Sequence, residues 1–299
     1  MKKNVIYIII AILMIGILVT AVIVTNQNKQ TKTEDGKFKI VTSFYPMYIL
    51  TANIVQGANN IELVNMTETN VGCIHDYTLT TSDMKKIENA DVFIENGLGL
   101  EEFITKALNT NTKMQIIDAS KDMINLIKED DQINPHVWTS LSQYIQQTKN
   151  IANALIEKNP ENAEIYEKNR DEYIGKLSRL KLNYETELQQ LNGRGAISLN
   201  EAFEYLGKET KLDLKTIHTD HEKNTISAET LKNIIDEMKE KNIKIILVDI
   251  NDNMKNAETI ANETGAIIYQ LDSGLTGSLS KDAYLNSMTG NLEKLKTIQ

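Results

Sequence analysis

The chain has 299 residues, enough for two domains of ordinary size, and its 41% hydrophobic and 24% charged residues are typical of a folded globular protein. Its net charge of −9 argues against sequence-independent nucleic-acid binding, which needs a basic face to neutralise phosphates. A single cysteine excludes an internal disulfide and a cysteine-rich zinc site.

The first 28 residues are predicted to anchor the chain in a membrane. Lys2 and Lys3 are the only charged residues there, and they precede an uninterrupted run of apolar and small residues over 5–25. As a helix this run would extend roughly 31 Å, enough to cross the hydrocarbon core, with the remainder of the chain outside the cytoplasm. The run lacks the small-x-small exit of a signal peptide and a cysteine for lipid attachment, so we expect an uncleaved anchor, with cleavage as the alternative.

The rest of the chain is predicted to form a tether and two α/β lobes joined by a long helix. In the N-terminal lobe, residues 38–158, short β-rich runs alternate with helical patterns, which favours a parallel sheet covered by helices. The tether is 29–37; the expected strands of this lobe are 38–44, 61–65, 92–95 and 114–118, and its helices 47–55, 82–88, 101–108 and 141–155.

A linking helix is expected over 159–191, because Asn159-Pro160 combines a preferred N-cap residue with proline in the first turn. The alternation of strands and helices then resumes in the C-terminal lobe, 192–299. Its expected strands are 195–199, 244–249 and 266–271, and its helices 201–208, 228–241, 254–264 and 281–298. The predicted fold class is therefore α/β, with two Rossmann-like lobes, a rigid linking helix and an N-terminal transmembrane anchor.

Two of the four histidines stand in loop-like segments just before helical patterns. His75 lies in a turn-like stretch, and His136 follows Asn134-Pro135. Loops that bound α/β elements often carry ligand groups, because the sheet holds them in place. Taken alone, each histidine is still more typical of a structural or solvent-exposed residue than of a ligand.

Six short segments, taken in their order along the chain, indicate a protein family. They are Ser43-Phe44-Tyr45-Pro46, Gly72-Cys73-Ile74-His75-Asp76-Tyr77, Asn96-Gly97-Leu98-Gly99-Leu100-Glu101, Pro135-His136-Val137-Trp138, Asn200-Glu201-Ala202-Phe203 and Asp282-Ala283-Tyr284-Leu285. Together, over about residues 38–298, they resemble the metal-binding solute-receptor family of bacterial ABC importers, which captures zinc or manganese. One departure is Ile74, which stands where the family has a proline.

The resemblance implies four positions that converge on one ion in the cleft between the lobes. Carried over by position, they are His75, His136, Asn200 and Asp272. Imidazole suits zinc and manganese alike, and Asp272 follows a predicted strand, where a carboxylate would face the cleft.

Asn200 departs from the family, which places His or Glu at this position. A neutral amide is a poor zinc ligand, although its carbonyl oxygen binds harder ions. Three interpretations stay open: Asn200 coordinates weakly through oxygen, the adjacent Glu201 takes the role, or the site uses three protein ligands and a water.

The function implied by the resemblance is capture of Zn²⁺ or Mn²⁺ on the extracytoplasmic face of the cell membrane. The expected partners are an ABC permease and its ATPase, and we expect a monomeric protein that is no enzyme and binds no nucleic acid. Two alternatives remain. One is a metal-dependent hydrolase using His75, His136 and Asp272 with Glu201 as base, although no H-E-x-x-H motif is present. The other is a degenerate receptor or adhesin that no longer takes metal.

Overall fold

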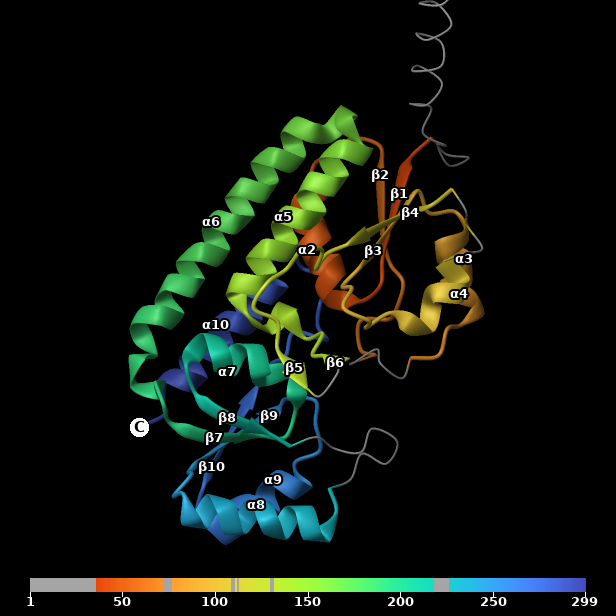
Figure 1. Cartoon of the computed structure of the whole chain (residues 1–299). Coiled ribbons are helices and arrows are strands. Elements are labelled where there is room, and N and C mark those ends of the chain that lie inside the picture. Colours follow the sequence, from red (N-terminus) through yellow and green to blue (C-terminus); the bar gives the residue numbers. More distant parts are fainter. Residues whose placement is uncertain (1–35, 72–76, 109–110, 112, 130–131, 218–225) are drawn as a thin grey trace, which may run out of the picture.

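Two parallel sheets organise the computed structural model, which describes residues 36–71, 77–108, 111, 113–129, 132–217 and 226–299. The first sheet has the strand order β2-β1-β3-β4 and the second β10-β9-β7-β8, and every pairing within them is parallel. The predicted α/β class with two parallel sheets is therefore confirmed (Figure 1).

The first sheet is built from the early, β-rich runs of the chain. Its strands are β1 (Phe38–Thr42), β2 (Ile61–Asn65), β3 (Val92–Glu95) and β4 (Gln115–Asp118). The connecting helices are α2 (Tyr45–Val55), α3 (Thr81–Glu88) and α4 (Thr105–Leu108), the last preceded by the 3₁₀ turn η1 (Glu102–Ile104). Helix α3 begins with a reciprocal capping box, in which the side chains of Thr80 and Asp83 each accept a hydrogen bond from the other residue's backbone N–H.

The second sheet and its helices repeat the same alternation. Its strands are β7 (Gly195–Ser198), β8 (Asp213–Thr216), β9 (Ile245–Asp249) and β10 (Ile267–Leu271). The helices are α7 (Glu204–Thr210), preceded by the 3₁₀ turn η5 (Glu201–Phe203), then α8 (Ala228–Glu240), α9 (Lys255–Thr264) and α10 (Ala283–Lys296). Because parallel strands end at the same edge, the loops after β7, β9 and β10 lie near one another.

Two long helices lie on one side of the first sheet, and the longer of them extends to the second lobe (Figure 1). α5 (Leu141–Lys158) is followed by the 3₁₀ turn η3 (Pro160–Asn162) and by α6 (Ala163–Glu187), which contacts α2 and α5 of the first lobe and α10 of the second. Leu177 of α6 belongs to one buried apolar cluster that also contains Ile40 of β1 and Leu247 of β9. The two sheets thus share a continuous core through the helices between them.

Three details differ from the expected elements. β8 had not been predicted: it is a short edge strand whose side chains are alternately exposed and half-buried, and Leu214 is the only apolar residue of its Asp-Leu-Lys-Thr sequence. The two-residue strands β5 (Lys128–Glu129) and β6 (Gln132–Ile133) pair antiparallel before the His136 segment and were also missed. The regular part of the linking helix begins at Ala163, three residues after Pro160.

The predicted anchor over residues 1–28 lies outside the described residues. Within the described part of the chain, we find no helix with the length and apolar character of a membrane span.

Candidate functional site

His136 is a buried residue whose ring is held by a neighbouring amide. The side chain is 2% exposed and stands just before the 3₁₀ turn η2 (Val137–Thr139). Its Nδ1 lies 2.9 Å from Oδ1 of Asn134, and the same oxygen accepts a hydrogen bond of 2.9 Å from the His136 backbone N–H. Because a carbonyl oxygen only accepts, Nδ1 carries the ring proton of the neutral imidazole. Nε2 is then the nitrogen with a lone pair for a metal ion.

The segment that follows His136 is hydrogen-bonded to the second lobe. Trp138 donates from Nε1 to the carbonyl of Ser273 at 3.0 Å, and Thr139 Oγ1 donates to the carbonyl of Ala202 at 2.6 Å. Tyr284 of α10 donates to the Trp138 carbonyl at 2.7 Å. The segment therefore lies where the two lobes meet.

A buried carboxyl group supports the same segment from the first lobe. Glu101 accepts hydrogen bonds from Ser43 Oγ at 2.8 Å and from the backbone N–H groups of Asn96 and Gly97 at 2.7 and 3.1 Å. Burial raises the pKa of Glu101 to about 8, while these hydrogen bonds oppose the rise. Asn96 in turn donates to the Pro135 carbonyl at 3.0 Å, so the loop after β3 and the His136 segment are held together.

Asn200 and Glu201, the two residues left open by the sequence, have different surroundings. Asn200 Oδ1 accepts from the backbone N–H of Ala202 at 2.9 Å and caps the turn η5, while its Nδ2 donates to Asp252 Oδ2 at 2.9 Å. Both polar ends of this amide are therefore engaged in hydrogen bonds within the second lobe. Glu201 instead places Oε1 3.9 Å from Nε2 of His136.

The separation between Glu201 and His136 suits a shared metal ion. Zinc binds imidazole nitrogen and carboxylate oxygen at about 2.0–2.2 Å. Two such bonds separate their donor atoms by roughly 3.4 Å at a tetrahedral angle and by roughly 4.3 Å at most, and the observed distance between Oε1 and Nε2 is 3.9 Å. One ion could therefore contact both atoms with little movement of either side chain.

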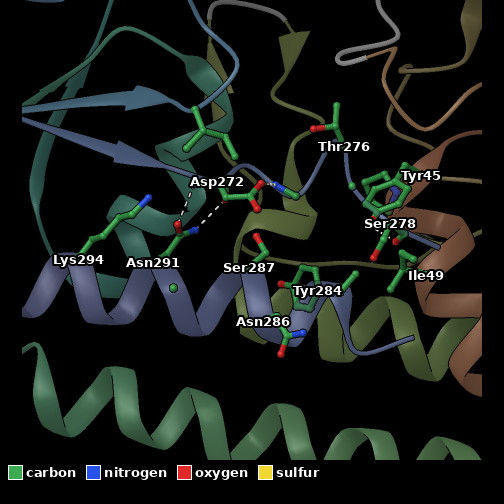
Figure 2. Close-up of a pocket in the computed structure, with 16 residues that line it drawn as sticks. Tyr45, Ile49, Asp272, Thr276, Ser278, Tyr284, Asn286, Ser287, Asn291 and Lys294 are labelled. Atoms are coloured by element: carbon green, nitrogen blue, oxygen red, sulfur yellow. Dashed lines mark hydrogen bonds between the residues drawn. The ribbon is translucent and has the colours of Figure 1, made fainter. Parts of the chain in front are cut away.

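Asp272 follows β10 and is held by a ring of hydrogen bonds (Figure 2). Its Oδ1 accepts from the Gly274 backbone N–H at 2.8 Å, and its own backbone N–H and carbonyl are both bonded to the side-chain amide of Asn291 on α10. Asp272 lines a pocket of about 380 Å³ together with Tyr45, Tyr284 and neighbouring residues of α10. Burial and the charge of Asp272 raise the pKa of Tyr45 to about 12.

The structure brings some of the expected site residues together and leaves others untested. His136 and Glu201 are neighbours, whereas His75 lies outside the described residues. In the described part of the chain, no three His, Cys, Asp or Glu side chains are grouped closely enough to hold a metal ion. The roles of His75 and Asp272 as ligands therefore stay predictions.

Three supporting residues had not been singled out from the sequence. Asn134 precedes His136 by two residues, and a turn-forming Asn-Pro pair was the signal that could have drawn attention to it. Asp252 and Asn291 support Asn200 and Asp272 from 52 and 19 residues away along the chain. Contacts between residues so far apart along the chain cannot be predicted from a local sequence pattern.

The chain matches one protein family and is similar in sequence to known zinc-uptake and zinc-binding proteins. The model of the family described as "ZnuA: Zinc-uptake complex component A periplasmic" matches residues 40–298. The chain is 30% identical over 298 residues to the high-affinity zinc uptake system protein ZnuA of Bacillus subtilis, with 90% of this chain and 91% of that protein covered. It is 29% identical over 286 residues to the zinc-binding lipoprotein AdcA of Streptococcus pneumoniae, where 89% of this chain covers 56% of the relative, about half its length.

Among solved structures, the chain is similar to FpvC from Pseudomonas aeruginosa in complex with Mn²⁺. The TM-score is 0.77 at 27% sequence identity, and the match covers 87% of this chain and 97% of that one.

Proposed function

The chain belongs to the ZnuA family, the zinc-uptake complex component A, and on that premise we propose that it is an extracytoplasmic solute-binding protein that delivers a divalent transition metal to an ABC permease. Relatives are named for zinc, and the similar FpvC structure holds Mn²⁺, so we propose zinc or manganese as the cargo. The observation that carries the proposal is the buried His136, with Nδ1 bonded to Asn134 and Nε2 3.9 Å from a carboxylate of the other lobe.

Glu201, rather than Asn200, is the proposed third ligand. Its support is the position of Oε1 beside His136 Nε2, together with the engagement of both polar ends of Asn200 elsewhere. A carboxylate contributes negative charge that an amide lacks, and it suits both zinc and manganese.

His75 and Asp272 complete the proposed ligand set of two imidazoles and two carboxylates. His75 is proposed from the resemblance of its segment to the family. Asp272 is proposed because it follows β10 directly, at the edge where the loops after β7 and β9 also lie, and next to Ser273, which accepts the hydrogen bond of Trp138. Such a set of N and O donors does not by itself select between the two metals.

The proposed organisation is an N-terminal lobe at 38–158, a linking helix at 159–191 and a C-terminal lobe at 192–299. Residues 1–28 are proposed to anchor the chain beside its permease and ATPase, with 29–37 as tether and the receptor acting as a monomer. Because α6 shares one apolar cluster with both sheets, we expect capture and release to involve small shifts of the lobes rather than wide opening.

The hydrolase alternative requires an activated water and a general base besides the metal. We propose that Glu201 serves as a ligand, which leaves no assigned base, and the relatives named above are uptake and metal-binding proteins. Hydrolysis by the purified protein that is lost on His136→Ala would instead favour the enzyme.

Calorimetric titration of residues 30–299 with zinc and then manganese tests the proposal. We expect one ion to bind per chain, and binding to be lost in His136→Ala, because the buried imidazole supplies one of the two atoms that flank the proposed ion position. If neither metal produces binding heat or a rise in melting temperature, the degenerate receptor or adhesin is the better description.

A further inference from the structure

Asn134 connects the two lobes where the proposed metal ligands meet, through its side-chain amide. The residue is 5% exposed, and this amide makes four hydrogen bonds. On one side, Oδ1 accepts from the backbone N–H of His136 and contacts its Nδ1. On the other side, Nδ2 donates to the Glu201 carbonyl at 3.2 Å and to Glu204 Oε2 at 2.9 Å.

The acceptors in the second lobe decide which way this amide points. The carbonyl of Glu201 and the carboxylate of Glu204 accept hydrogen bonds and donate none. Nδ2 of Asn134 must therefore face them, and Oδ1 must face His136. An oxygen beside Nδ1 requires a proton on that nitrogen, which leaves Nε2 as the lone-pair nitrogen.

We propose that Asn134 is a positioning residue: Glu204 sets the direction of its side-chain amide, and the amide in turn orients the ring of His136. Because of the charge of Glu204, the residue at position 134 must be a neutral amide. The inference rests on the proposed function, since it concerns how the metal-binding nitrogen of His136 is selected. It assigns a role to Glu204, whose carboxylate lies on the first residue of α7 and contacts the site only through Asn134 among the contacts described.

Replacing the amide of Asn134 with a carboxylate tests whether Glu204 requires a neutral group at this position. In Asn134→Asp the second oxygen would replace Nδ2, 2.9 Å from Glu204 Oε2 and 3.2 Å from the Glu201 carbonyl. Like charges at that distance repel each other in a partly buried place such as this one. The added Glu204→Gln substitution removes the charge and supplies an N–H₂ group that can donate to the new carboxylate.

The test uses the full chain, purified in detergent, in five forms: wild type, Asn134→Asp, Glu204→Gln, the double variant Asn134→Asp/Glu204→Gln, and Asn233→Asp as a matched control. Asn233 lies exposed on α8, so its substitution adds the same charge away from the site. Affinity for zinc and for manganese is measured by titration. The protonated ring nitrogen of His136 is identified in metal-free protein by ¹⁵N NMR, with His136→Gln used to assign its signals.

We expect Asn134→Asp to bind metal about 10–100-fold more weakly than wild type, the usual cost of disturbing a residue that orients a ligand. The double variant should recover to within a few-fold of wild type, and Asn233→Asp should not differ from it. The metal-free wild type should carry its His136 proton on Nδ1. If Asn134→Asp does not fold, a double variant that folds and binds metal supports the inference equally.

Three results would overturn the inference: a double variant as weak as Asn134→Asp, a His136 proton on Nε2 in the metal-free wild type, or unchanged metal affinity in Asn134→Asp. Failure of the proposed function gives a different result, because the wild type would then bind neither metal. The NMR measurement on metal-free protein still decides the orientation of His136 in that case.

Discussion

At the scale of single residues, the sequence neighbours Asn200 and Glu201 make different contacts. Asn200 caps η5 and holds Asp252, whereas Glu201 extends its carboxylate to His136. The cap contributes to folding, whereas the role proposed for Glu201 is in metal binding. Substitution of each residue should therefore affect different measurements.

We expect Glu201→Gln to weaken zinc and manganese binding at least tenfold, with little change in the stability of the metal-free protein. Asn200→Ala should instead lower the free energy of unfolding by about 1 kcal/mol, the usual cost of a lost N-cap, with a smaller effect on affinity. Calorimetric titration and urea unfolding of both variants separate the two effects. A stronger loss of affinity in Asn200→Ala than in Glu201→Gln would contradict this assignment.

At the scale of elements, helix α5 begins with a cap supplied by the other lobe. Ser140 accepts from the backbone N–H of Gln143, and Glu209 of α7 accepts from the N–H groups of Leu141 and Ser142 at 2.6 and 3.0 Å. A negative charge at a helix N-terminus stabilises the partial positive charge there. Glu209 therefore joins α7 to α5, and with it the second lobe to the first.

Glu209→Gln should lower the free energy of unfolding by about 1 kcal/mol, because the charge at the N-terminus of α5 is lost while the side-chain shape is kept. Urea unfolding of the metal-free protein measures the change. Glu240→Gln, on the exposed last residue of α8, is the matched control and should be close to neutral. Equal effects of the two substitutions would argue against the cap.

The pairing of β3 with β4 places two carboxylates side by side. Glu95 and Asp118 are direct partners in the parallel register, and burial together with the charge of Asp118 raises the pKa of Glu95 to about 7. The unfolded chain has a Glu pKa of about 4.3. Protonated Glu95 is therefore favoured in the folded state, and the stability it contributes is complete below about pH 4 and is lost as the pH rises through about 7.

Glu95→Gln should remove this dependence, because glutamine is neutral at every pH. We expect the melting temperature of the variant to exceed that of the wild type at pH 8 by a few degrees, where about 2–4 °C corresponds to each kcal/mol. At pH 4 the two proteins should melt at similar temperatures. An advantage of the same size at both pH values would mean that the ionisation of Glu95 is not its cause.

At the scale of the whole molecule, one apolar cluster runs through both sheets and the helices between them. A ligand that contacts both lobes should therefore stabilise the protein as a unit. At a free metal concentration a hundred times the dissociation constant, the gain is about 2.7 kcal/mol, or roughly 5–10 °C in melting temperature.

We expect this metal-induced rise in melting temperature to shrink as the pH falls through the histidine range. A histidine ligand must be neutral to bind, so protons compete with the ion. Thermal unfolding with and without zinc at pH 8 and pH 5.5 measures the effect. A rise of the same size at both pH values would contradict ligation by histidine.

The sequence by itself determined the α/β class, the strands and helices with clear patterns, and the family to which the chain belongs. Apolar strands such as β9 are visible within a few residues. The polar edge strand β8 was missed, because its backbone pairing with β7 depends on the neighbouring strand rather than on an apolar pattern of its own.

Only the tertiary structure decided which of two adjacent side chains faces His136 and which ring nitrogen is held by Asn134. Asn200 is turned toward Asp252, 52 residues further along the chain, and Asn134 is oriented by Glu204, 70 residues further. The direction of a short side chain depends on such distant partners, because the hydrogen bonds that orient it form only when the lobes have come together.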